Sequence, residues 1–126
     1  MNEGKREKTA KAWIALQRSP IYSSAYDENF WASNAVWRMV ESDPEECWKV
    51  ILTILSIEKD DWILENLGAG PLEDLLVAHG PVIIDKLEKI AMRDPVFHRL
   101  AQFVWRNDIL DDVWERLKRV ASGSTS

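Results

Sequence analysis

Two neighbouring carboxylates and a histidine stand close together in the middle of the sequence. Glu73 and Asp74 fall in the first turn of an expected helix, and His79 follows near its end. A carboxylate beside a histidine can transfer protons or bind a polar partner. The spacings of six and five residues align neither carboxylate with His79 as well as a spacing of four would. The alternative role for Glu73 and Asp74 is that of helix-start charges, which the helix dipole stabilises.

Asp85 extends this group, and a small hydrolase or metal-assisted enzyme would use its members together: Glu73, Asp74, His79 and Asp85. A metal site needs three or four ligands, whereas His79 and His98 stand 19 residues apart and lack a local ligand spacing. The Gly68-Ala69-Gly70 segment is followed by proline and not by the lysine of a P-loop. We therefore expect no catalytic residue set, no metal and no cofactor, and keep the enzyme as the alternative.

The sequence contains seven tryptophans in 126 residues, which is many for this length. Trp37 and Trp105 fit the apolar faces of their expected helices, which predicts that both lie in the core. Trp31, Trp48 and Trp62 stand toward the flanks of apolar stripes, where they either pack at the edge of the core or anchor a partner. The candidate binding residues are thus Glu73, Asp74, His79, Asp85, Trp31, Trp48 and Trp62.

The elements that position these residues are predicted to be helices. Apolar residues recur at spacings of three and four, and Asp43-Pro44 and Asp94-Pro95 are typical helix starts. We expect Gly68-Ala69-Gly70 to end one helix and Gly80-Pro81 to separate two others. The predicted fold is all-α, with about eight short helices in a compact bundle or a short HEAT-like superhelix of helical hairpins. The expected helices cover about 9–18, 28–41, 43–55, 60–66, 71–80, 81–91, 94–105 and 111–120.

The length and charge of the chain narrow the function classes. At 126 residues it predicts one helical domain over 1–121, followed by a disordered tail over 122–126. The formal net charge of -5 argues against a nucleic-acid binder. Residues 27–74 carry three basic and twelve acidic residues, which favours a protein partner with a basic surface. No apolar run is long enough for a membrane span and the N-terminus is polar, so we expect a cytoplasmic protein.

Several short motifs together resemble a known family. They are the Gly70-Pro71-Leu72-Glu73-Asp74-Leu75-Leu76 block with His79-Gly80 and Asp85, the Asp43-Pro44-Glu45 start with Trp48, and the later pairs Asp94-Pro95, Val104-Trp105 and Val113-Trp114. Over roughly residues 28–117 the chain resembles a family of small bacterial proteins known only as a domain of unknown function. The resemblance implies an all-helical fold and a bacterial source, and it implies no activity.

The acidic middle and the tryptophans favour a non-enzymatic protein–protein interaction module. By analogy with other small acidic helical proteins, this module would be an immunity protein, an inhibitor or a regulatory adaptor. A scaffold that assembles with copies of itself through its tryptophans is a further possibility, and the sequence leaves the oligomeric state open.

Overall fold

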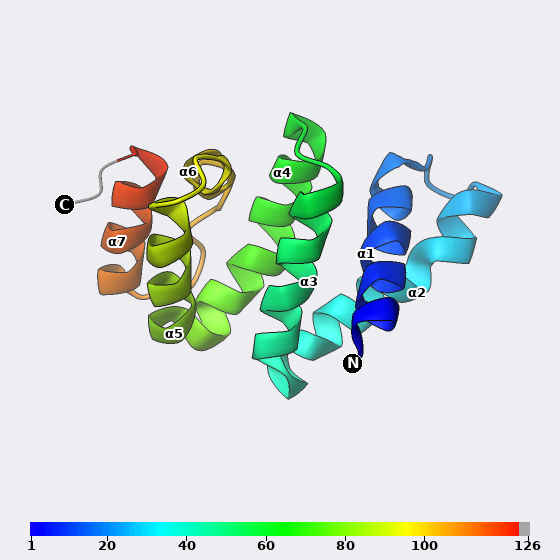
Figure 1. Cartoon of the computed structure of the whole chain (residues 1–126), viewed down its shortest axis with the longest axis horizontal. Coiled ribbons are helices and arrows are strands. Elements are labelled where there is room, and N and C mark those ends of the chain that lie inside the picture. The colour runs from blue at the N-terminus through cyan, green and yellow to red at the C-terminus, as the bar shows by residue number, and fades with distance from the viewer. Residues whose placement is uncertain (124–126) are drawn as a thin grey trace. The chain divides into compact units, whose positions relative to one another are not determined.

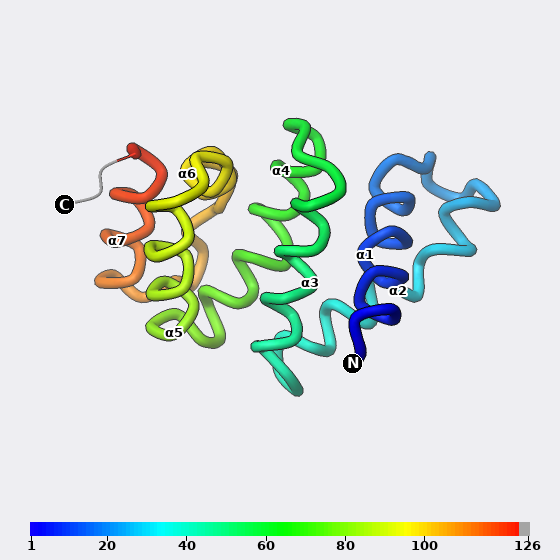
Figure 2. The backbone as a smooth tube through the Cα atoms, in the orientation of Figure 1, coloured from blue at the N-terminus to red at the C-terminus, as the bar shows by residue number. Residues whose placement is uncertain are grey.

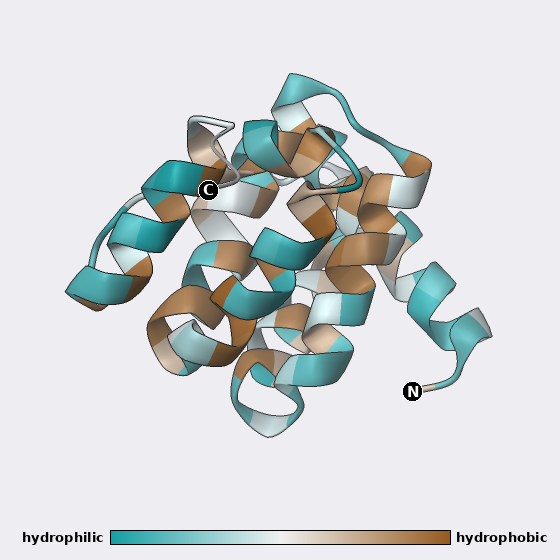
Figure 3. Ribbon diagram, turned by 60° about the vertical axis from the view of Figure 1, so that its left-hand side comes forward, coloured by the Kyte–Doolittle hydropathy of each residue, from teal (hydrophilic) through white to brown (hydrophobic). Residues whose placement is uncertain are grey.

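The computed structural model describes residues 1–123, which form seven α-helices and one π-helical turn and contain no strand. The predicted all-α fold is therefore confirmed (Figure 1). The elements are α1 (Glu3–Arg18), α2 (Ser24–Ser42), α3 (Pro44–Ile57), α4 (Asp61–Leu67), η1 (Gly68–Leu72), α5 (Glu73–Ala91), α6 (Val96–Ala101) and α7 (Asp111–Ala121). Along these helices apolar residues recur among polar ones, and the hydropathy colouring of Figure 3 shows both kinds on each ribbon.

The chain divides into two compact units, Met1–Ile63 and Leu64–Ser126, and the boundary falls inside α4. The single domain expected over 1–121 stays a prediction. Of the tail expected over 122–126, residues 124–126 lie outside the described residues.

In the first unit, α1 packs against both α2 and α3. The buried side of α2 consists of Ala32, Val36, Met39 and Val40, and α1 buries Trp13 with small residues beside it. Small side chains let helices approach closely. Trp37 lies at the edge of this buried side, about 60° around the helix axis from Val40, and is 68% exposed, so its predicted place in the core was wrong.

Side-chain caps explain where the helices of the first unit begin. The Asn2 side chain accepts the Lys5 N–H at 2.8 Å, which starts α1 earlier than its apolar pattern indicates. Asp43 accepts the Glu46 N–H ahead of Pro44, as the sequence predicts for α3. Glu46 is itself buried, and the Arg6 guanidinium binds its carboxylate at 2.8 Å, joining α1 to α3.

In the second unit, the helical backbone continues through the segment that we expected to break it. Gly68–Leu72 forms a π-helical turn between α4 and α5. Pro71 lacks an N–H and would clash with a preceding carbonyl in a regular α-helix, and a wider turn accommodates it. The predicted stop at Gly68-Ala69-Gly70 was therefore wrong.

The break predicted at Gly80-Pro81 is present within α5. His79 has non-helical dihedral angles (φ -138°, ψ 40°), and the chain changes direction there (Figure 2). A Cβ at Gly80 would lie 3.0 Å from a methyl group of Val113, so glycine lets α5 approach α7 closely.

The predicted helix over 94–105 is shorter in the structure. Asp94 accepts the Val96 N–H, but α6 ends at Ala101 and residues 102–110 form the connection to α7. Trp105 lies in this connection and is 70% exposed, so its predicted place in the core was also wrong.

The run Asp61–Ala91 is long and apolar enough, by length and composition alone, to cross a membrane. Its most apolar window has a mean hydropathy of only 1.2 and is 56% buried within the protein. A core helix of a soluble protein has the same properties, and this burial is consistent with that reading.

Two glycines of the π-helical turn provide a test of this packing. A Cβ at Gly68 would lie 2.8 Å from Cβ of Phe103 and 3.0 Å from the Leu100 carbonyl oxygen, whereas a Cβ at Gly70 meets nothing within 4 Å. We expect Gly68→Ala to lower the free energy of unfolding by about 1–3 kcal/mol in urea titrations. Gly70→Ala is the matched control and should leave stability unchanged or slightly raised. Equal effects of the two substitutions would contradict the close approach at Gly68.

Candidate functional site

Glu73 is a buried carboxylate that holds a surface loop. It is only 7% exposed and accepts the Trp105 backbone N–H at 3.1 Å and the side-chain amide of Asn107. Both donors belong to residues 102–110, the connection between α6 and α7. The carboxylate satisfies these donors in a setting largely removed from water, which fixes the loop against the start of α5.

Asp74 is half-buried beside Glu73. Burial raises the pKa of the Asp74 carboxyl, and the neighbouring Glu73 charge raises it further. The helix-dipole role considered for this pair was wrong, because η1 continues directly into α5 and leaves no free helix N-terminus at residue 73.

The other two members of the predicted cluster lie at different places along α5. His79 occupies the break of the helix. Asp85 binds the Arg116 guanidinium of α7, which also binds Glu88 at 3.0 Å. The hydrogen bond that Arg116 donates to Asp85 lowers the pKa of the Asp85 carboxyl.

Glu73 and Asp85 thus have separate roles in the contacts of the second unit. Glu73 binds the α6–α7 connection, and Asp85 binds α7. Within residues 1–123, no group of three or more histidine, cysteine, aspartate or glutamate side chains is arranged to hold a metal ion.

The three candidate tryptophans of the first unit differ in exposure. Trp48 is 6% exposed and packs inside, so it offers little surface to a partner. Trp62 is 52% exposed, and its indole N–H donates to the Gln17 carbonyl at 2.8 Å. This bond fixes the indole ring while leaving much of it in solvent.

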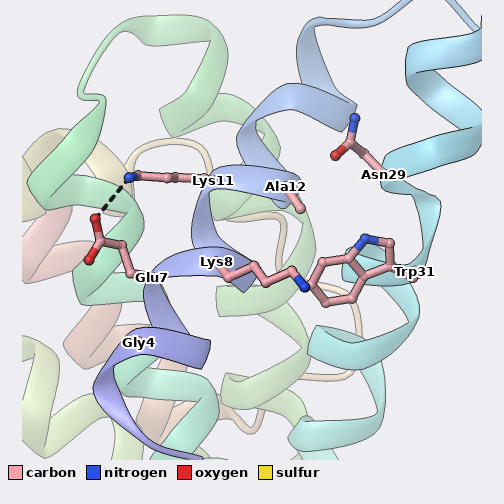
Figure 4. A pocket seen from close by; sticks show the side chains of 7 residues that line it. All are labelled: Gly4, Glu7, Lys8, Lys11, Ala12, Asn29 and Trp31. Carbon is pink, nitrogen blue, oxygen red and sulfur yellow. Dashed lines mark ion pairs between the residues drawn. The ribbon is translucent and has the colours of Figure 1, made fainter.

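Trp31 lies at the edge of a shallow hollow between α1 and α2 (Figure 4). The Lys8 ammonium lies 6.0 Å from the centre of its ring, at the limit for a cation–π contact. The hollow has a volume of about 580 Å³. Its lining residues are Gly4, Glu7, Lys8, Lys11, Ala12, Asn29 and Trp31.

Sequence reasoning missed an aromatic ridge on α2. We define this ridge as Tyr26, Phe30 and Trp37, which follow each other at spacings of four and seven residues and therefore lie on one side of the helix. The Tyr26 and Phe30 rings are in contact, with centroids 5.7 Å apart, and Phe30 is 43% exposed. The periodicity of these residues was visible in the sequence, but it did not show which side of an apolar helix the core would take.

A second exposed aromatic site lies on the α6–α7 connection. Trp105, Phe103 and Trp114 contribute to a hollow of about 440 Å³. Because Glu73 binds the Trp105 backbone, the exposed indole is carried by a loop that is held in place. Tryptophan is among the side chains that are enriched at the energetic centres of protein interfaces.

These features define a small all-α protein with aromatic side chains placed on the surface of each unit. The chain belongs to DUF6869, a family of unknown function whose pattern matches residues 19–125. The resemblance to a family of unknown function is thereby confirmed, and α1 precedes the matched segment. No curated protein and no solved structure matches the chain.

Replacing Glu73 tests its role in holding the loop. In Glu73→Ala the donors of Trp105 and Asn107 lose their acceptor, so we expect a loss of about 1–3 kcal/mol in the free energy of unfolding. Amide hydrogen exchange over 102–110 should also accelerate. The control is Asp108→Ala, which removes an exposed carboxylate of the same loop. A loss of stability without faster exchange in the loop would contradict the anchoring role.

The raised pKa of Asp74 predicts a pH-dependent effect. A carboxyl whose pKa is higher in the folded state favours the fold when protonated, and this contribution is lost as the pH rises through the folded pKa. Asp74→Asn should therefore raise stability at pH 7, and its advantage should vanish below the ordinary aspartate pKa of about 4. Urea titrations at pH 3 and pH 7 measure this difference, and an advantage of equal size at both pH values would refute the assignment.

Proposed function

We propose that this chain is a non-enzymatic protein–protein interaction module. The observation that carries the proposal is the exposure of tryptophans in both units, with Trp37 at 68%, Trp62 at 52% and Trp105 at 70%. Leaving indole surface in water is unfavourable, and such side chains are typical anchors of interfaces. The indole N–H of Trp62 is bonded within the chain, so its ring is already oriented for contact.

The charge of the chain supports a partner with a basic surface. Residues 27–74 carry a net charge of -9, and several of the carboxylates are exposed and form no ion pair within residues 1–123. Opposite charges steer partners together and accelerate association, most strongly at low salt. Binding should therefore weaken as the ionic strength rises.

The biological setting is part of the same proposal. An immunity protein, an inhibitor or a regulatory adaptor in the bacterial cytoplasm would suit a small acidic domain with aromatic anchors. The single cysteine, Cys47, is buried, which suits a reducing compartment.

The alternative, a small hydrolase or metal-assisted enzyme, has less support. It requires Glu73, Asp74 and Asp85 to act on a substrate, together with His79. Glu73 already binds the α6–α7 connection and Asp85 already binds Arg116, so both carboxylates are engaged by the chain itself.

An affinity capture with matched baits tests the proposal. The full chain is immobilised and exposed to lysate of the bacterium that encodes it, at low and moderate salt. We expect one dominant protein, with capture that falls as salt rises and falls at least about tenfold when Trp37 or Trp105 is replaced by glutamine.

The control bait carries Asp74→Asn and His79→Gln, which should retain the partner. Capture that is insensitive to salt would contradict the electrostatic part of the proposal. Capture that survives both tryptophan substitutions but is lost in the control bait would contradict the role of the tryptophans and favour the predicted cluster.

A further inference from the structure

We infer that the aromatic ridge of α2 is a docking surface for a basic amphipathic helix of a partner protein. The inference rests on the proposed function and adds to it the surface and the chemistry of the partner. It starts from the arrangement of Tyr26, Phe30 and Trp37 on one flank of α2, next to the side that the helix buries.

The ridge is a coherent apolar strip rather than a set of scattered residues. Phe30 and Trp37 are seven residues apart, which places them within about 20° of each other around the helix axis. Tyr26 packs against Phe30 one turn earlier, and Tyr22, 90% exposed, precedes it in the turn before α2. A strip of this kind matches the apolar face of a helix laid along α2.

Each end of the ridge carries a carboxylate. Asp27 precedes Phe30 by three residues, and Glu41 follows Trp37 by four, so both lie beside the strip. Both side chains are exposed, and neither has an ion-pair partner in the part of the chain that the structure describes. Asp43 and Glu45 add exposed negative charge just beyond Glu41.

The single positive charge of α2 lies to one side of the ridge, one turn before Glu41. Arg38 is the single basic residue of the helix and directly follows Trp37, so it projects about 100° around the axis from it. The strip therefore presents aromatic surface in its middle and negative charge at its ends. A partner with the reverse arrangement, basic at both ends and apolar between, is complementary to it.

The spacing of the carboxylates sets the length of the partner segment. Asp27 and Glu41 are 14 residues apart, which corresponds to about 21 Å along the helix axis. A partner helix of about 14 to 16 residues spans this distance. Its apolar residues would recur at spacings of three and four, and its lysines or arginines would stand in the first and last turns.

The helix that carries the ridge is held in place by the first unit. Its N-terminus is capped by Ser23, which accepts the Tyr26 N–H at 3.1 Å, and its inner side packs on α1. A surface that is ordered before binding loses little conformational freedom when a partner docks. The ridge can therefore act as a template for a segment that folds on binding.

The test is a selection from a library of random 16-residue peptides displayed on phage, with the full chain as bait. We expect enriched peptides to carry net positive charge, with basic residues toward both ends and apolar residues at helical spacing. Fluorescence anisotropy with the labelled peptides then measures affinity. Trp37→Gln and Glu41→Lys should each weaken binding at least about tenfold, and binding should weaken with salt.

The matched control is Met92→Gln, which removes an apolar side chain of nearly the same exposure from the other unit. It should leave peptide affinity unchanged, and circular dichroism confirms that each variant is folded. Failure to enrich peptides, enrichment without a charge bias, or equal affinity for Trp37→Gln would overturn the inference. A dimer of the chain that Trp37→Gln dissociates would assign the ridge to a second copy and would also overturn it.

The two proposals can fail separately. If affinity capture yields a partner that Trp105→Gln abolishes and Trp37→Gln retains, the interaction module stands and the ridge is not its binding surface. If capture yields no partner and no peptide binds, both proposals fail.

Discussion

A carboxylate removed from water must find donors, and this requirement ties together distant parts of each unit. Glu46 and Glu73 are the buried charged residues among those described, one in each unit. Glu46 is bound by Arg6, 40 residues earlier in the chain, and Glu73 binds Trp105 and Asn107, more than 30 residues later. Loss of either set of donors would leave a buried charge without compensation, which is far more costly than loss of an exposed ion pair. The two glutamates therefore fix which segments meet, while apolar burial supplies most of the favourable free energy.

The surface aromatic residues follow from how the core is filled. In α2 the inner side is made of alanine, valine and methionine, so the helix packs closely on α1 and its ring-bearing side remains in solvent. In the second unit α6 ends early, and the tryptophan that would continue its apolar face is instead carried on a loop. Trp37 and Trp105 are thus both exposed, for two different local reasons, and each is carried by a backbone that the rest of its unit holds in place.

Most of the helices could be predicted from the sequence, because their signals are local. Asp43-Pro44 begins α3 and Gly80-Pro81 breaks α5, as cap and proline chemistry require. The prediction failed where tertiary contacts decided the outcome. Gly68-Ala69-Gly70-Pro71 has the composition of a stop, yet the close approach of Phe103 to Gly68 accompanies a continuous helical backbone. Trp37 and Trp105 were misplaced because periodicity identifies an apolar side without showing whether another element covers it. The binding role of Glu73 was hidden for a related reason, since its partners are distant in sequence.

The π-helical turn also determines the direction in which each later residue of α5 points around the helix axis. A wider turn holds one more residue than an α-helical turn and so offsets the later residues by about 100° around the axis. With this offset Glu73 points to the connection between α6 and α7, and Leu75 and Leu76 point into the core. Loss of Pro71, which a regular α-helix does not accommodate, would allow a regular helix here and turn the Glu73 carboxylate away from its donors without changing its chemistry. In related chains the length of this short segment is therefore as informative as its composition.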